Sequence, residues 1–147
     1  YGELESKLTA VSARRDTAHA EIKRIESRSA ELALVMKHAG TYRQLKPLYE
    51  RYRKSNDKEK FLRGHESEII LFEAAARELK RLGTVPLPTT ESMKTELANL
   101  NAEKERLLAE YKAARAEAQE YETVKQNVDA LLTVAKEQEQ QRRHELE

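Results

Sequence analysis

Two long stretches of this chain carry apolar residues at alternating spacings of three and four. This heptad pattern places one apolar stripe on each of two helices, over about residues 3–39 and 93–135. Arg15 and Ser29 interrupt the first stripe, and Lys104 and Lys125 interrupt the second. The apolar positions are Leu4, Leu8, Val11, Ala18, Ile22, Ile25, Leu32, Met36 and Ala39 in the first stretch and Met93, Leu97, Leu100, Leu107, Tyr111, Ala114, Ala118, Tyr121, Val128, Leu132 and Ala135 in the second.

A chain with two such stripes folds by pairing long helices along narrow seams. Charged residues make up 36% of the 147 residues, which leaves too little apolar surface for a thick core. We therefore expect an all-α fold: an elongated antiparallel coiled-coil hairpin of two long helices with a two-helix insertion at the tip. An intermolecular coiled coil would use the same seams, so the heptads also allow a homodimer.

The expected boundaries follow from glycine and proline. Residues 1–40 form the first coiled-coil helix, which ends at Gly40, and residues 41–83 form short helices that make a basic and aromatic tip. Residues 84–90, TVPLPTT, form a loop, because two prolines separated by one residue do not fit inside a helix. Residues 91–147 form the long second coiled-coil helix with a polar tail.

The short helices have two possible beginnings. Thr41 and Gln44 resemble a capping box, whereas Pro47 fits the first turn of a helix. Either Thr41 caps a kinked helix or the regular part begins at Pro47, and both alternatives place a bend here. Asn56 followed by Glu59 then predicts the start of the next helix, which runs to Leu82 and Gly83.

An antiparallel hairpin also predicts which residues face each other. If Met36 lies near Leu97, then Leu8 lies near Val124 or Val128. The same alignment places two alanines at positions 114 and 118 opposite Ala18, where small side chains let the helix backbones approach closely.

Residues typical of catalytic and metal sites are missing from the sequence. There is no cysteine, the four histidines are far apart, and no glycine-rich phosphate loop or nucleophile elbow is present. We therefore expect no catalytic residue, no cofactor and no metal in this chain. No apolar run approaches the roughly 20 residues that span a bilayer, so we also expect no membrane insertion.

Positive charge is concentrated between Thr41 and His65. This stretch holds eight Lys and Arg residues against three acids, a balance of +5, whereas the whole chain carries +1. Basic residues bind phosphates, and aromatic rings stack on unpaired bases. The candidate nucleic-acid-binding residues are Arg43, Lys46, Arg51, Arg53, Lys54, Lys58, Lys60, Arg63, Tyr49 and Tyr52. The alternatives are that the tyrosines pack in a core and that the basic residues are merely solvated.

Four segments resemble the C-terminal helical region of relaxase/mobilisation proteins of conjugative transposons and related integrative elements. They are the Tyr-x-x-Leu-Lys-Pro segment at residues 42–47, Lys58–Phe61 followed by His65 and Glu66, Pro86–Pro88, and Val-Lys-x-Asn-Val-Asp at residues 124–129. The resemblance covers about residues 41–132. The first helix is similar only in its coiled-coil character.

The resemblance implies a role in conjugation. Such relaxases nick one DNA strand at the transfer origin with an N-terminal nuclease domain, which has a tyrosine nucleophile and a metal held by histidines. This chain lacks the histidine cluster, so Tyr1 is not expected to be that nucleophile, and we expect the chain to be a piece of a larger protein. The implied function is a non-catalytic accessory domain in the bacterial cytoplasm that assists binding of transfer-origin DNA or docks relaxosome or secretion coupling proteins.

A second function fits the same pattern. A purely structural coiled-coil spacer or dimerisation element would need the heptads but no DNA contact. Under that hypothesis the basic stretch is solvated surface.

Overall fold

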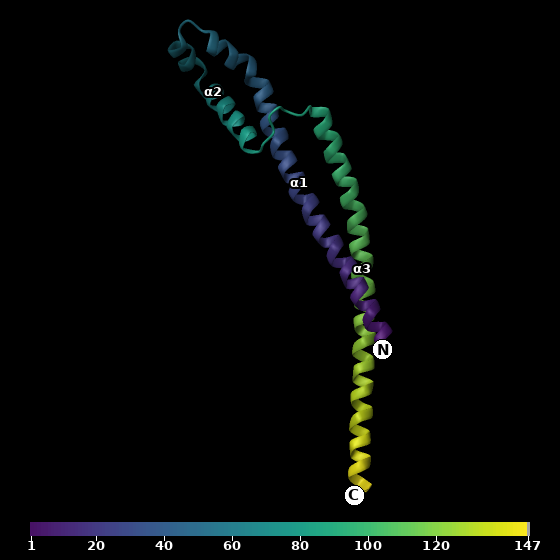
Figure 1. The fold of residues 1–147 in the computed structure, drawn as a ribbon. Coiled ribbons are helices and arrows are strands. Elements are labelled where there is room, and N and C mark those ends of the chain that lie inside the picture. The colour runs from purple at the N-terminus through teal and green to yellow at the C-terminus, as the bar shows by residue number, and fades with distance from the viewer. Residues whose placement is uncertain (147) are drawn as a thin grey trace. The chain divides into compact units, whose positions relative to one another are not determined.

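The computed structural model describes residues 1–146, and Glu147, the last residue of the expected tail, lies outside the described residues. Three helices make up this part of the chain: α1 (Gly2–Lys54), α2 (Lys58–Arg81) and α3 (Thr90–Leu146) (Figure 1). The described residues contain no strand, so the predicted all-α class is confirmed. The contacts divide the chain into two units. One joins Tyr1–Arg24 to the part of α3 that begins at Glu103, and the other is Ile25–Ala102.

In the first unit, the beginning of α1 and the middle of α3 lie side by side and run in opposite directions. Residue numbers in α1 rise as those of their α3 partners fall, which defines an antiparallel pair. The polar contacts between the two helices are Tyr1 with Asp129 at 2.6 Å, Glu5 with Lys125 at 3.9 Å, Arg14 with Glu117 at 3.3 Å and Arg24 with Glu103 at 3.8 Å. These contacts lie at or near the surface, so each contributes little to the free energy of folding.

Small side chains form the seam of this first unit. Val11 clusters with Ala114 and Ala118, and Leu8 and Tyr121 pack against them. Both alanines are buried, as the sequence predicts, but Val11 lies against them where Ala18 was expected. The predicted alignment is therefore wrong at this point, because the packing of Leu8, Val11 and Tyr121 around the two alanines sets a different register.

The second unit combines three helical segments around a core of larger side chains. Residues 25–54 of α1, the whole of α2 and residues 90–102 of α3 contribute to it. The buried apolar side chains are Ile25, Leu32, Val35, Ala39, Ile69, Phe72, Ala75, Leu79, Met93 and Leu100. The bidentate contact of Arg28 with Glu96, at 2.7 and 3.1 Å, joins α1 to the beginning of α3.

Helix α1 continues through two residues that were expected to end or bend it. The predicted stop at Gly40 is wrong, and so are the predicted starts at Thr41 and Pro47, because α1 is helical from Gly2 to Lys54. The Thr41 hydroxyl donates to the Lys37 carbonyl within the helix instead of capping a new one. Aromatic rings of α1 on both sides of Pro47 stack on α2, and this packing outweighs the local preference for a break.

Only α2 is therefore a separate helix between residues 41 and 83. Its N-cap is Asp57, one residue after the predicted Asn56, and the Asp57 carboxylate accepts the Lys60 amide at 3.1 Å. Non-helical dihedral angles at His65 (φ −136°, ψ 26°) kink α2 directly after Gly64.

A Schellman arrangement ends α2 at the predicted glycine. The Gly83 amide donates to Lys80 and the Thr84 amide to Leu79, both at 3.1 Å. Gly83 has φ +71°, a left-handed conformation that side-chain-bearing residues rarely adopt. The chain therefore turns sharply away from α2 into the proline-containing loop.

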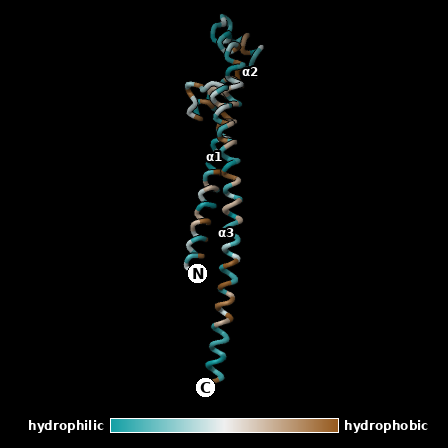
Figure 2. The backbone as a smooth tube through the Cα atoms, turned by 90° about the vertical axis from the view of Figure 1, so that its right-hand side faces the viewer, coloured by the Kyte–Doolittle hydropathy of each residue, from teal (hydrophilic) through white to brown (hydrophobic). Residues whose placement is uncertain are grey.

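Helix α3 begins at a threonine cap and has a long exposed end. The Ser92 amide donates to the Thr89 hydroxyl at 3.1 Å, which satisfies one free donor of the first turn. Residues 129–146 of α3 are exposed. Figure 2 shows that the hydropathy of α3 changes along this end, from an apolar part to a strongly polar terminus. No helix in residues 1–146 combines the length and the apolar character that crossing a membrane requires.

Candidate nucleic-acid interface

We call residues 41–65 the basic segment; it lies within the second unit. Five of its cationic residues stand on the last turns of α1 and three on the first turns of α2. A turn of three residues, Ser55–Asp57, separates the two helices. The eight residues, all exposed, are Arg43, Lys46, Arg51, Arg53, Lys54, Lys58, Lys60 and Arg63. Folding therefore brings the two groups of positive charge to one end of a helical hairpin.

Hydrogen bonds hold the turn between these groups. The Ser55 amide donates to the Tyr52 carbonyl at 3.2 Å, and the Ser55 hydroxyl accepts the Asp57 amide at 3.2 Å. The Asp57 carboxylate then caps α2. Ser and Asp are favoured here because their short side chains satisfy amides that no helix carbonyl reaches.

Three of the eight cations already contact other parts of the protein. Arg43 donates to the Thr90 hydroxyl at 2.7 Å and to the Pro88 carbonyl at 2.5 Å, so this guanidinium holds the proline-containing loop. The Lys46 ammonium lies 5.9 Å from the centre of the Tyr42 ring, and the Arg51 guanidinium lies 5.7 Å from that of Phe61. These two contacts are weak cation–π interactions at the surface.

The other five cations form no ion pair with any residue between 1 and 146. They are Arg53, Lys54, Lys58, Lys60 and Arg63. Their charges are solvated and available to an external anion. This exposed set is the part of the predicted site that the fold leaves most accessible.

The aromatic residues of the basic segment pack against α2. Phe72 stacks with both Tyr42 and Tyr49, at ring-centre distances of 4.8 and 4.4 Å. Tyr52 stacks on Phe61 at 6.0 Å. All three tyrosines are half-buried. The packing alternative therefore accounts for Tyr49 and Tyr52, whose stacked faces contact protein rings.

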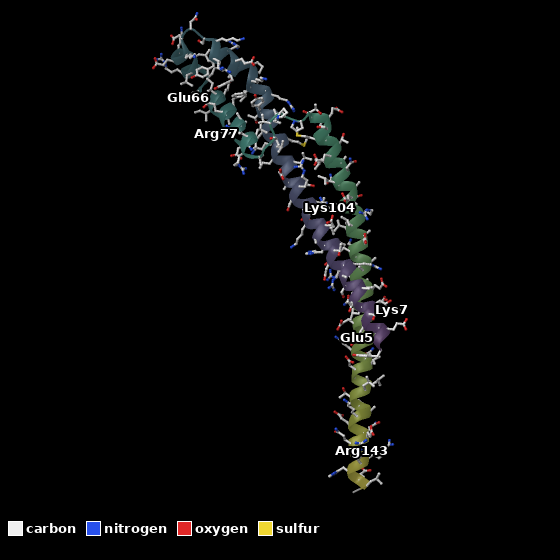
Figure 3. The ribbon with its side chains drawn as sticks, viewed as in Figure 1. Glu5, Lys7, Glu66, Arg77, Lys104 and Arg143 are labelled. Carbon is white, nitrogen blue, oxygen red and sulfur yellow. The ribbon has the colours of Figure 1, made fainter. Side chains whose placement is uncertain are left out.

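An open groove runs beside these rings. Arg77 of α2 lines it together with two cations of the basic segment, and the carboxylates of Glu50 and Glu73 lie along the same groove. Figure 3 labels Arg77 on α2. The full lining is Tyr42, Lys46, Tyr49, Glu50, Arg53, Phe72, Glu73, Ala76 and Arg77. The mixed charge makes this groove a poorer phosphate site than the turn.

Arg77 was not among the predicted site residues, because it lies 12 positions after His65, where the concentration of positive charge in the sequence ends. Arg77 lines the groove together with Phe72 and Ala76 of the same helix. Residues 1–146 contain no cluster of three or more His, Asp or Glu side chains arranged to hold a metal ion.

Comparison with known proteins adds no relative. No protein family model, no curated protein and no solved structure matches this chain.

Proposed function

We propose that this chain is a non-catalytic helical accessory domain of a conjugative relaxase and that its basic segment binds the phosphates of transfer-origin DNA. The single observation that carries the DNA contact is the set of five exposed cations without ion pairs around the Ser55–Asp57 turn. The assignment to a relaxase rests on the resemblance over about residues 41–132.

The mode of binding follows from the aromatic packing. The tyrosines of the basic segment stack on Phe61 and Phe72, so their role is to hold α1 against α2. The cations then act on the nucleic-acid backbone, which carries the same charge in every sequence. We therefore propose binding that is independent of base sequence and strongly weakened by salt.

The proposal includes an architecture and a setting. An antiparallel coiled-coil hairpin would carry the basic segment as an insertion and present it to DNA beside the nuclease domain of a larger bacterial, cytoplasmic protein. If DNA does not bind, the alternative is that the chain docks relaxosome or secretion coupling proteins. Catalysis belongs to the nuclease domain and not to this chain.

Charge reversal tests the DNA contact. The variant Arg53→Glu, Lys54→Glu, Lys58→Glu and Lys60→Glu removes four of the five exposed cations of the turn. Fluorescence anisotropy with labelled single-stranded and duplex DNA, between about 50 and 200 mM salt, measures affinity and its salt dependence. We expect at least about 100-fold weaker binding at low salt and a salt slope that is shallower by about 3 to 4 for duplex DNA.

The matched control reverses four exposed cations outside the basic segment that also form no ion pair: Lys23, Lys94, Lys112 and Arg115. Both variants have the same net charge. Equal weakening by the two would show that only total charge matters and would overturn the assignment to the basic segment. No binding by the wild-type chain at low salt would overturn the DNA contact itself.

The structural spacer is the second candidate function. The contacts of Arg43 favour the spacer, because its guanidinium holds the proline-containing loop. Part of the positive charge therefore stabilises the fold. A homodimer through the original heptad seams would have to open this chain, since Ile22 and Leu107 are buried within it. If the chain is a spacer, it should not bind DNA in the anisotropy experiment.

A further inference from the structure

A second groove, with a mainly apolar lining, is formed where the proline-containing loop passes α1 and α2. Ala76 and Leu79 of α2 and Val85, Pro86 and Leu87 of the loop line it. Its volume is about 510 Å³, and ligand sites in proteins typically have volumes of about 300–1,000 Å³. We call it the loop groove. All of its residues belong to the second unit.

Hydrogen bonds hold the loop that forms one side of the loop groove. The Thr84 hydroxyl donates to the Leu79 carbonyl at 3.0 Å, which ties the beginning of the loop to α2. Arg43 donates to the Pro88 carbonyl, which ties the end of the loop to α1. Val85 between these two points is nevertheless 70% exposed. A ligand that covers this apolar side chain gains free energy, and it does not first have to order the loop.

Among residues 1–146, two lysines and no carboxylate line the loop groove. They are Lys46 of α1 and Lys80 of α2. Both are exposed, and neither forms an ion pair with any residue between 1 and 146. The groove beside the tyrosines differs, because the carboxylates of Glu50 and Glu73 line it. The loop groove therefore complements a ligand that is apolar in part and negatively charged, and it disfavours a basic one.

The two lysines lie at different distances from the Ser55–Asp57 turn. Lys46 is nine residues before the turn, and Lys80 is 23 residues after it. On either side of this turn α1 and α2 run in opposite directions (Figure 1). Lys46 therefore stands toward the end of the loop groove that is nearer to the turn, and Lys80 stands toward the other end. A fatty acid, with one carboxylate, pairs with only one of them, whereas a peptide can carry carboxylates on both sides of an apolar residue.

We propose that the loop groove binds a peptide segment of another protein in which large apolar side chains are flanked on both sides by Asp or Glu. The apolar side chains cover Val85 and Leu87, and the flanking carboxylates pair with Lys46 and Lys80. Exposed ion pairs contribute little free energy, so the apolar contacts supply most of the affinity and the lysines select acidic ligands. This proposal does not rest on DNA binding, because Val85 and Lys80 lie outside the basic segment.

Fluorescence anisotropy tests the groove, with the 147-residue chain and a labelled peptide of sequence Glu-Glu-Ser-Leu-Phe-Leu-Ser-Glu-Glu. We expect a dissociation constant on the order of ten to a hundred micromolar. Val85→Glu places a negative charge in the apolar part of the groove, so it should weaken binding at least about tenfold. Leu71→Glu is the matched control, because Leu71 is 55% exposed and does not line the groove. This control should change the affinity less than about twofold.

Two results would overturn the assignment to the loop groove. One is equal weakening by Val85→Glu and Leu71→Glu, and the other is no binding of the peptide at protein concentrations up to the millimolar range. Both substituted residues are exposed, so circular dichroism should show the same helix content in the two variants and the wild-type chain.

A second set of measurements tests the chemistry of the ligand. A peptide with Lys in place of each Glu should bind at least about tenfold more weakly than the acidic peptide. Lys80→Glu should weaken the acidic peptide and strengthen the basic one. Lys23→Glu, at an exposed lysine of the first unit, should change neither. Equal binding of the two peptides would overturn the charge selection. Displacement of the acidic peptide by dodecanoate would show that one carboxylate suffices, and it would overturn the assignment to a peptide.

Discussion

The two units of this molecule use the same kind of helix but bury different side chains. In the first unit half of the buried apolar residues are alanines, and two helices make the contact. In the second unit three helical segments enclose larger residues such as Phe72, Met93 and Ile25. A pair of helices has only a narrow seam to bury, whereas a third helix closes a core that holds large side chains. The candidate binding residues stand on the unit with the larger buried side chains.

Truncating the aromatic centre of the second unit should give the largest loss of stability. Phe72→Ala removes a buried ring that stacks on Tyr42 and Tyr49, so we expect the free energy of unfolding to fall by about 3–5 kcal/mol. Chemical denaturation followed by circular dichroism measures this change. Leu71→Ala, at an exposed neighbouring position, should cost under about 0.5 kcal/mol. A Phe72→Ala loss no larger than the control would break the comparison between the units.

Enlarging a seam alanine should have the next largest effect. Ala114 is fully buried against Val11, and a leucine there would push the two helices of the first unit apart. We expect Ala114→Leu to lower the free energy of unfolding by about 1–3 kcal/mol. The matched substitution Ala113→Leu is on the exposed side of α3 and should be nearly neutral. A stabilising Ala114→Leu would mean that the seam is loose and that close helix approach is not its basis.

The ion pairs between α1 and α3 should show the smallest difference. Arg28 contacts both oxygens of Glu96 in the second unit, whereas Arg14 makes one contact with Glu117 in the first. Double-mutant cycles with alanine should give a coupling below about 1 kcal/mol for the former, which is only partly buried, and near zero for the latter, which is exposed. A stronger coupling for Arg14 with Glu117 than for Arg28 with Glu96 would mean that the first unit has the stronger ion pair, which would contradict the prediction.

Local chemistry explains which helix ends were predictable. Gly83 ends α2 because few other residues adopt its left-handed conformation, and Thr89 caps α3 through its own side chain. Both signals act within a few residues and need no distant partner. Gly40 and Pro47 carry equally clear local signals, yet α1 passes through both. The rings of Tyr42 and Tyr49 stack on Phe72, which is 30 and 23 residues away in sequence, and no local pattern contains that contact.

The candidate site divides in the same way. Composition identified the concentration of charge in residues 41–65, and the eight cations are exposed as a solvated or phosphate-binding surface requires. Arg43 holds the proline-containing loop, whereas Arg53 forms no ion pair within residues 1–146. The two arginines differ in this way because the loop and the beginning of α3 lie beside Arg43 in the folded chain. Arg77 joins the groove only because α2 folds back along α1.

By itself, the sequence determined the helical class, the two apolar stripes and the place of the positive charge, because periodicity and composition belong to residues near one another along the chain. The tertiary structure decided that α1 continues to Lys54, that Val11 meets Ala114, and that the tyrosines pack against α2. Those outcomes depend on the packing of residues far apart in sequence, where burying an aromatic ring outweighs the cost of an imperfect helical residue.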